Sequence, residues 1–204
     1  MHDPLMQDRL ALITAAQRLA ASGLSPGTSG NLSLRTDGGI LITPSAISYG
    51  SLTPDSLPLL KPQRGYGEYD GPLRPSSEWR FHLDIYLARP EIHAIVHHHA
   101  PCTTALAMAR RDIPACHYMI ASFGGASIRC APYALFGTAA LSTAVLHALA
   151  GRSACLMANH GGLATAATIT DALAAAIELE ALAQHYILSL SAGGPVLLSD
   201  AQIA

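Results

Sequence analysis

Three consecutive histidines, His97, His98 and His99, end an apolar stretch that begins at Ile92. Successive side chains of a β-strand point to opposite faces, so this pattern places His97 and His99 on one face and His98 on the other. Two imidazoles side by side can chelate a divalent metal ion, and imidazole is a frequent ligand of zinc. The alternative is a polar strand end with solvated histidines. A metal site therefore requires a third nitrogen ligand and a carboxylate from elsewhere in the chain.

Two further residues can complete such a ligand set. His160 follows the apolar segment 153–158 and precedes two glycines, where a side chain is exposed at a sheet end and the backbone can bend around a ligand. Glu78 follows two serines in the first turn of an expected helix. Taken alone, His160 is an ordinary loop residue, and Glu78 is a residue that interacts favourably with the helix dipole. With His97 and His99 they give three nitrogens and one carboxylate, the composition of a catalytic zinc site with an exchangeable position.

Small hydroxyl and amide side chains gather at expected turns and at an expected helix start. Such positions offer backbone N–H groups and hydroxyls to a phosphate without requiring a lysine. Taken one at a time, each residue is explained as a turn or capping residue. The Walker A loop and the Rossmann glycine pattern are both absent from the sequence. The segments are Thr28-Ser29-Gly30-Asn31, Ser76-Ser77, and Ser45 with its neighbour Ala46.

Composition excludes several classes of protein. At 204 residues, half of them hydrophobic and 13% charged, the chain fits one globular domain over 1–204 with some surface buried between subunits. A net charge of −2 and the lack of a basic cluster argue against nucleic acid or an anionic membrane as a partner. No apolar run is long enough to cross a bilayer, the N-terminus lacks the blocks of a signal peptide, and the scattered cysteines fit reduced thiols. We therefore expect a cytoplasmic protein.

The only lysine, Lys61, directly precedes a proline in an expected loop. Schiff-base chemistry needs a desolvated lysine held in a pocket. The sequence therefore argues against a mechanism that uses a lysine imine.

The elements that must position these residues follow from apolar periodicity and capping signals. The turn sequence Asp37-Gly38-Gly39 predicts a hairpin that joins strands at 32–34 and 40–42. Residues 61–74 are expected to form an irregular loop. Because helices and strands alternate and some strands are hairpin-joined, we predict an α/β fold: a single domain with a central mixed, largely antiparallel β-sheet flanked by helices. Further strands are expected at 92–99, within 113–133 and at 153–158. Helices are expected at 5–21, from Ser76 or Ser77 to about Ala88, at 102–110, from Thr138 to near Gly151 and from Thr170 to about Ser191.

Seven segments, in one order and spread over almost the whole chain, resemble the class II aldolase/adducin family. No single segment is decisive, but all of them in sequence form a specific signal. They are Gly27–Ser33, Leu41–Ser45, Pro75–Glu78, Ala94–Ala100, Ile113–Ile120, Ala131–Thr138 and Asn159–Gly161.

The resemblance implies a class II, zinc-dependent aldehyde-lyase that cleaves a ketose 1-phosphate, similar to L-fuculose 1-phosphate, reversibly to dihydroxyacetone phosphate and an aldehyde. It implies that His97, His99 and His160 bind zinc, with manganese and cobalt as alternatives. It implies that Glu78 ligates the resting metal and acts as acid and base once substrate displaces it, a role for which we expect a raised pKa.

The resemblance also assigns the remaining parts of the site. It implies that Tyr118 reaches in from a neighbouring subunit of a homotetramer, with sites at subunit interfaces, and protonates the aldehyde oxygen. It implies that Phe136 lines the aldehyde pocket. The residues that it places around the substrate phosphate are Thr28, Ser29, Gly30, Asn31, Ser45, Ala46, Ser76 and Ser77.

Three departures from the family pattern concern the surroundings of the metal and the aldehyde. His98 stands where relatives commonly have Asn or Thr, and Gly162 replaces an apolar residue, a change expected to loosen a loop near the metal. The chain stops at Ala204, before the position of a tail tyrosine that acts on the aldehyde in the family. The metal set and Glu78 are intact, whereas the identity of the aldehyde is left open.

Other reactions of the same superfamily remain as alternatives because they use the same metal and enolate chemistry. They are 4-epimerisation of a pentulose phosphate, dehydration of a thio-sugar phosphate and decarboxylation of a sugar-acid phosphate. A non-catalytic, adducin-like interaction module is a further alternative, and it predicts that the metal ligands are lost.

Overall fold

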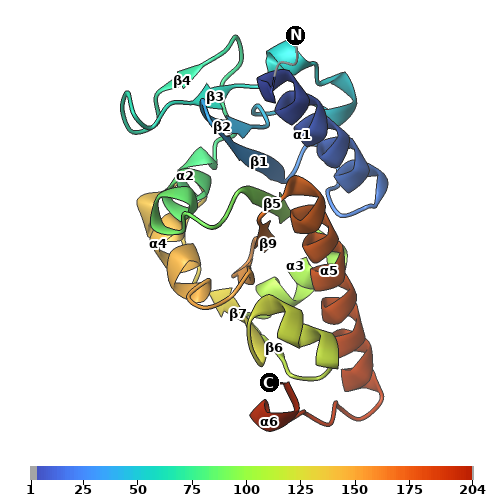
Figure 1. The fold of residues 1–204 in the computed structure, drawn as a ribbon. Coiled ribbons are helices and arrows are strands. Elements are labelled where there is room, and N and C mark those ends of the chain that lie inside the picture. Colours follow the sequence, from blue (N-terminus) through green and yellow to red (C-terminus); the bar gives the residue numbers. More distant parts are fainter. Residues whose placement is uncertain (1–3, 204) are drawn as a thin grey trace.

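The computed structural model describes residues 4–203, which form one mixed β-sheet with helices on both faces (Figure 1). Within the described part of the chain the sheet has nine strands, in the order β4-β3-β2-β1-β5-β9-β8-β7-β6. All neighbouring strands are antiparallel except β7 and β8. The strands are β1 Asn31–Thr36, β2 Gly39–Ile42, β3 Leu59–Leu60, β4 Tyr69–Asp70, β5 Ala94–His98, β6 Ile113–Pro114, β7 Ser127–Ala131, β8 Ala154–Met157 and β9 Gly161–Ala166.

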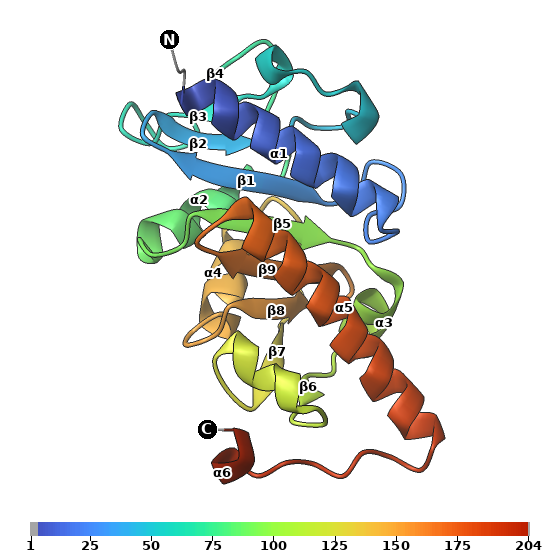
Figure 2. The same cartoon turned by 45° about the vertical axis from the view of Figure 1, so that its right-hand side comes forward.

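Two helical layers cover the sheet. Helices α1, α3 and α5 pack on one face and α2 and α4 on the other (Figures 1 and 2). The helices are α1 Pro4–Ala21, α2 Trp79–Ala88, α3 Pro101–Met108, α4 Ala139–Ala148, α5 Ile169–Ser191 and α6 Asp200–Ile203, with short 3-10 helices η1 Tyr49–Ser51, η2 Pro54–Ser56 and η3 Tyr118–Phe123. The predicted α/β fold with a mixed, mostly antiparallel sheet is confirmed.

The alternation of side chains along strand β5 explains why His97 and His98 point to opposite faces of the sheet. Ala94 and Val96 belong to the core under α1, α3 and α5, whereas Ile95 belongs to the core under α2 and α4. Alternation along the strand therefore places His97 on the α2 and α4 side and His98 on the opposite side. Both rings are fully buried, which rules out the solvated strand end.

Several expected boundaries were wrong. Helix α2 begins at Trp79, so Glu78 occupies the N-cap position rather than the first turn. Helix α5 is capped by Thr168, whose hydroxyl accepts a hydrogen bond from the backbone N–H of Asp171, and not by Thr170. The expected loop 61–74 contains the short strand β4, and the expected β-rich section contains η3. Strand β9 was missed because its first residues are glycines, which read as a turn.

Gly162 lies in β9 and not in a loop, so the expectation that it loosens the surroundings of the metal was wrong. It is buried and pairs with His98 across β5 and β9. A Cβ atom at this position would lie 2.5 Å from Thr103 Cγ2 and 3.2 Å from His98 Nε2. The ring of His98 therefore occupies space toward which a side chain at residue 162 would point, and the two departures from the family pattern are linked by packing.

We expect Gly162→Ala to lower the free energy of unfolding by about 1–3 kcal/mol, since the added methyl overpacks the space beside Thr103. Urea denaturation of the wild-type and variant proteins measures the change. Gly50→Ala is the control, because a Cβ there meets only Ser48 Oγ, at 3.9 Å. Equal stability of the two variants would contradict the packing account.

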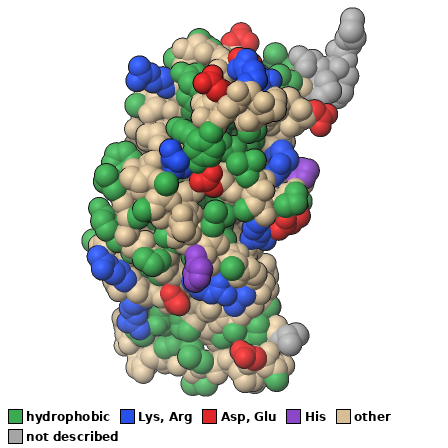
Figure 3. Space-filling view, turned by 90° about the vertical axis from the view of Figure 1, so that its left-hand side faces the viewer, with side chains coloured by type: hydrophobic (Ala, Val, Ile, Leu, Met, Phe, Trp, Pro, Cys, Tyr) green, Lys and Arg blue, Asp and Glu red, His purple; other side chains and the backbone are tan. Residues whose placement is uncertain are grey.

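The surface and the helices carry two further observations. No helix in residues 4–203 combines the length and the apolar character that crossing a membrane requires. On the face shown in Figure 3, basic side chains are interspersed with acidic ones and do not gather into a patch.

Candidate active site

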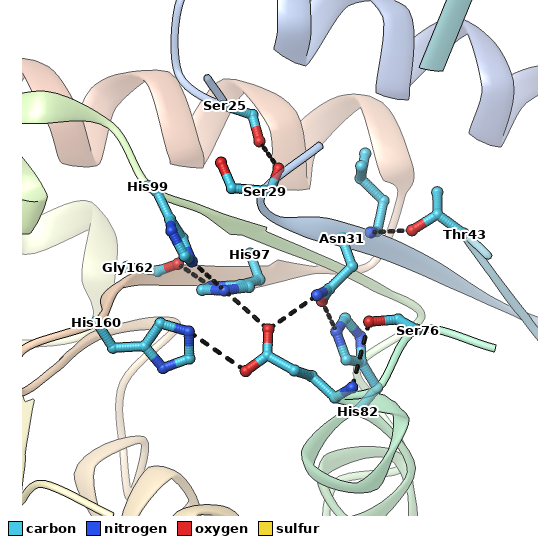
Figure 4. A network of polar contacts seen from close by, with 12 residues as sticks. Ser25, Ser29, Asn31, Thr43, Ser76, His82, His97, His99, His160 and Gly162 are labelled. Carbon is cyan, nitrogen blue, oxygen red and sulfur yellow. Dashed lines mark hydrogen bonds and ion pairs between the residues drawn. The ribbon is translucent and has the colours of Figure 1, made fainter. Parts of the chain in front are cut away.

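Three histidines from the end of strand β5 and from the turn between β8 and β9 converge beside the central strands (Figure 4). Strand β5 supplies His97, His99 lies just past the end of β5, and His160 lies in the turn between β8 and β9. One ring nitrogen from each residue lies within 4.8 Å of the others, and the Nε2 atoms of His97 and His99 are 3.0 Å apart. Nitrogens that bind one zinc ion at about 2.0–2.1 Å have a comparable spacing.

Backbone contacts orient these rings. The Nδ1–H of His97 donates to the carbonyl of Gly162 at 2.9 Å, which leaves Nε2 directed at the other histidines. His160 follows Asn159, which adopts a positive φ of 57° and donates its backbone N–H to the carbonyl of Ala107 at 2.9 Å. Arg110 Nε in turn donates to Asn159 Oδ1 at 3.0 Å. The turn that carries the third histidine is therefore tied to the C-terminal end of α3.

Glu78 faces the histidines from the start of α2 and is only 6% exposed. Its Oε2 lies 3.2 Å from His97 Nε2 and accepts a hydrogen bond from Asn31 Nδ2 at 3.0 Å. Its Oε1 lies 3.3 Å from His160 Nε2 and, among the residues that the structure describes, receives no hydrogen bond. A buried carboxylate that contacts two imidazoles and has one oxygen without a hydrogen bond is suited to bind a cation.

The protonation states suit metal binding. Burial, together with charge repulsion from His97, lowers the pKa of His99 to about 3 and that of His160 to about 4, so both rings are neutral near pH 7. Burial raises the pKa of Glu78, but the charges and hydrogen bonds of His97, His160 and Asn31 outweigh it, and the net pKa lies below its ordinary value. This direction is opposite to the raised pKa expected from the sequence. The neutral imidazoles of His99 and His160 and the ionised carboxylate of Glu78 are donors suited to a divalent metal.

A cleft of about 360 Å³ opens beside this cluster. Its lining contains every residue predicted around the phosphate, the predicted aldehyde-pocket residue Phe136, and Glu78, His99 and His160. Tyr118 is not part of the lining: it is exposed on η3, beside the ring of His117. The contribution of Tyr118 from a neighbouring subunit, and the binding roles of the lining residues, stay predictions. The phosphate set is Thr28, Ser29, Gly30, Asn31, Ser45, Ala46, Ser76 and Ser77.

Gly30 has a specific role in this arrangement. It adopts a positive φ of 79°, and a Cβ atom there would lie 2.6 Å from both the carbonyl oxygen of His97 and Ser25 Oγ. Only glycine allows the loop 28–31 to approach strand β5 this closely, which brings the cleft lining against the histidines.

Sequence reasoning missed several residues of the site. Tyr133, Leu135 and Asn159 line the cleft. His82 contacts the side chain of Asn31, which donates a hydrogen bond to Glu78. No local signal separates His82 from a core residue of an apolar helix, because its partner Asn31 lies on β1.

Comparison with known proteins agrees with this arrangement. The family profile described as "Class II Aldolase and Adducin N-terminal domain" matches residues 10–187. A 5-methylthioribulose-1-phosphate/5-deoxyribulose-1-phosphate aldolase of Rhodospirillum rubrum is 47% identical, over 93% of this chain and 85% of the relative. An L-fuculose phosphate aldolase of Escherichia coli K12 is 45% identical, over 95% of this chain and 89% of the relative. A solved L-fuculose 1-phosphate aldolase structure superposes with a TM-score of 0.92 and 36% identity, over 100% and 94% of the two chains.

The chain belongs to the class II aldolase/adducin family. With three convergent histidines and a buried carboxylate in place, it is a class II, metal-dependent aldolase and thus a lyase. The family resemblance read from the seven sequence segments is confirmed.

Proposed function

We propose that the protein cleaves a ketose 1-phosphate reversibly to dihydroxyacetone phosphate and an aldehyde, with zinc held by His97, His99 and His160. The observation that carries the proposal is the position of Glu78, which contacts His97 and His160 and also lines the cleft. A carboxylate in that position is within reach both of a metal and of a substrate carbon next to it. Manganese and cobalt are alternatives, because sites with three histidines accept several metals.

The chain's own residues account for proton transfer and substrate orientation. A bound zinc ion supplies a Lewis acid for the substrate carbonyl, the electron-sink role that a lysine imine has in other aldolases. In the direction of condensation, Glu78 takes the C3 proton of dihydroxyacetone phosphate, and in cleavage it returns the proton. Tyr118 from a neighbouring subunit of a homotetramer protonates the alkoxide of the aldehyde half.

The phosphate end of the substrate lies against neutral donors. Among the described residues that line the cleft, none is Lys or Arg. Hydroxyls and backbone N–H groups of the loop 28–31 and of Ser76 and Ser77, next to the N-terminal end of α2, therefore hold the phosphate. Holding the phosphate there fixes the distance of the reacting carbons from Glu78.

The aldehyde end lies against apolar side chains. Tyr133, Leu135 and Phe136 line the cleft and are each more than half exposed in the single chain. Such a lining favours an aldehyde with a methyl or thioether end, as in L-fuculose 1-phosphate, 5-deoxyribulose 1-phosphate and 5-methylthioribulose 1-phosphate, the substrates in the names of the relatives. We propose this group of substrates for the protein, which we place in the cytoplasm.

A panel of substrates tests the proposal. Purified, zinc-loaded protein is incubated with the three ketose 1-phosphates, a pentulose 5-phosphate and a sugar-acid phosphate, and dihydroxyacetone phosphate is measured by its enzymatic reduction. We expect release of dihydroxyacetone phosphate from at least one ketose 1-phosphate, its loss after chelation and its return with zinc. Epimerised, dehydrated or decarboxylated product without triose phosphate would contradict aldol cleavage and favour another reaction of the superfamily.

A further inference from the structure

A chain of buried polar side chains leads away from Glu78 through Asn31, the one of its further members that lines the cleft. Asn31 Nδ2 lies 3.0 Å from Glu78 Oε2, and Asn31 Oδ1 lies 2.5 Å from His82 Nε2 (Figure 4). His82 Nδ1 lies 2.7 Å from Ser33 Oγ, which lies 2.8 Å from the hydroxyl of Tyr86. Asn31 and Ser33 come from β1, and His82 and Tyr86 come from α2. None of the side chains beyond Asn31 belongs to the lining of the cleft or to the histidine cluster.

The orientation of the Asn31 amide, with Nδ2 toward Glu78 and Oδ1 toward His82, fixes the direction of the hydrogen bonds in this chain. Asn31 Nδ2 donates to Glu78 Oε2, and Asn31 Oδ1 faces His82. Since an amide oxygen only accepts, His82 carries its proton on Nε2, and its bare Nδ1 accepts from the hydroxyl of Ser33. Ser33 Oγ then accepts from the hydroxyl of Tyr86. The donors from Ser33 to Asn31 thus point toward Glu78, while the hydroxyl of Tyr86 also lies 3.4 Å from the carbonyl of His93, a second acceptor.

We propose that His82 is a positioning residue for the acid and base of the reaction: it locks the Asn31 amide in the one orientation that donates to Glu78. A reversed amide would direct an oxygen at the carboxylate and push it away from its contacts with His97 and His160. The proposal deepens the proposed function and rests on the role of Glu78 in proton transfer.

The positions of Asn31 and Glu78 distinguish the proposed role of His82 from that of an ordinary buried histidine. Asn31 is the register partner of His97 in the β1 and β5 pair, so the residue that His82 orients stands beside a candidate metal ligand. Glu78 and His82 lie four residues apart, on one side of the start of α2, and Asn31 contacts both. His82 is fully buried, with its ring stacked on Phe81 at 4.6 Å, so it has no freedom to rotate out of this contact.

Two amide variants of His82 test the proposal because each mimics a different ring nitrogen. Gln places its amide nitrogen near the position of Nε2 and can still donate to Asn31, whereas Asn reaches only the position of Nδ1 and retains the contact with Ser33 alone. We expect His82→Asn to lower kcat by about 10–100-fold with KM changed less than about threefold and zinc content unchanged. We expect His82→Gln to recover about tenfold of that loss.

Ser142→Ala is the matched control for stability. Its buried hydroxyl, on α4, donates to Asp84 at 2.5 Å, and Asp84 lies on α2 like His82 but is not a member of the polar chain that ends at Glu78. We expect it to reduce the free energy of unfolding without a change in kcat. Equal kcat losses in His82→Asn and His82→Gln, or no loss in either, would overturn the proposal and leave His82 as a residue of the core.

Two further measurements keep the result interpretable. Glu78→Gln separates the failure of the two proposals. If this variant retains wild-type kcat, the proposed function fails. If it is inactive while His82→Asn is fully active, only the positioning role of His82 is contradicted. Nitrogen NMR of the zinc-loaded wild-type protein tests the direction without any variant. We expect His82 to carry its proton on Nε2, and a proton on Nδ1 would overturn the proposal.

Discussion

Replacing Glu78 with Gln is expected to lower kcat for aldol cleavage by about 10²–10⁴-fold, the usual contribution of a general acid or base. Gln has nearly the same size and fits the buried position, but its amide cannot accept and return the C3 proton near neutral pH. The three histidine nitrogens remain, so zinc content is expected to stay near that of the wild-type protein. Steady-state release of dihydroxyacetone phosphate and metal analysis of the purified variant measure both effects.

Asp84→Asn is the control for this prediction. Asp84 is a second carboxylate of α2, and it accepts hydrogen bonds from Ser142 and Tyr66 rather than facing the histidines. We expect it to lower stability by about 1–3 kcal/mol and to leave kcat unchanged. A Glu78→Gln variant whose kcat stays within about tenfold of the wild-type value would show that Glu78 is not the base.

The convergence of the histidines was predictable because strand alternation is a local property. Successive residues of Ala94–His99 point to opposite faces of β5, and these faces are covered by different helical layers. The sequence alone therefore predicts that His97 and His99 share a face. That His160 joins them depends on β9, which the sequence did not reveal. Its opening glycines have low strand propensity, and they form a strand only because β5 and β8 lie on either side of it.

The environment of Glu78 could not be predicted for the same kind of reason. The direction of its pKa depends on the distances to His97 and His160, which come from elements far apart in the sequence. His82 escaped notice because a single histidine in an apolar helix is indistinguishable from a core residue until its partners on β1 are seen. Local pattern thus indicates which residues can do chemistry, while tertiary contacts set their protonation and orientation.

Replacing His97 with Ala is expected to empty the metal site and to reduce aldolase activity to background. The variant retains two of the three histidine nitrogens, so zinc would be held only by recruiting Glu78, which in turn loses the ring next to its Oε2. Metal analysis and the assay for dihydroxyacetone phosphate measure the outcome. Added zinc is expected to restore little of the activity, because Glu78 is the remaining donor beside the vacated position and cannot act as acid and base while it holds the metal.

His98→Asn is the matched control, because the two residues are adjacent on opposite faces of β5. His98 Nδ1 accepts the backbone N–H of Ala100 at 3.3 Å, a contact that the oxygen of Asn can retain, and its Nε2 has no hydrogen bond within residues 4–203. We therefore expect normal zinc content and activity, with a loss of about 1–3 kcal/mol in unfolding free energy from the space left beside Gly162. If His98→Asn lost its zinc as His97→Ala does, His98 would face the metal, and the register of β5 against β9 would be wrong.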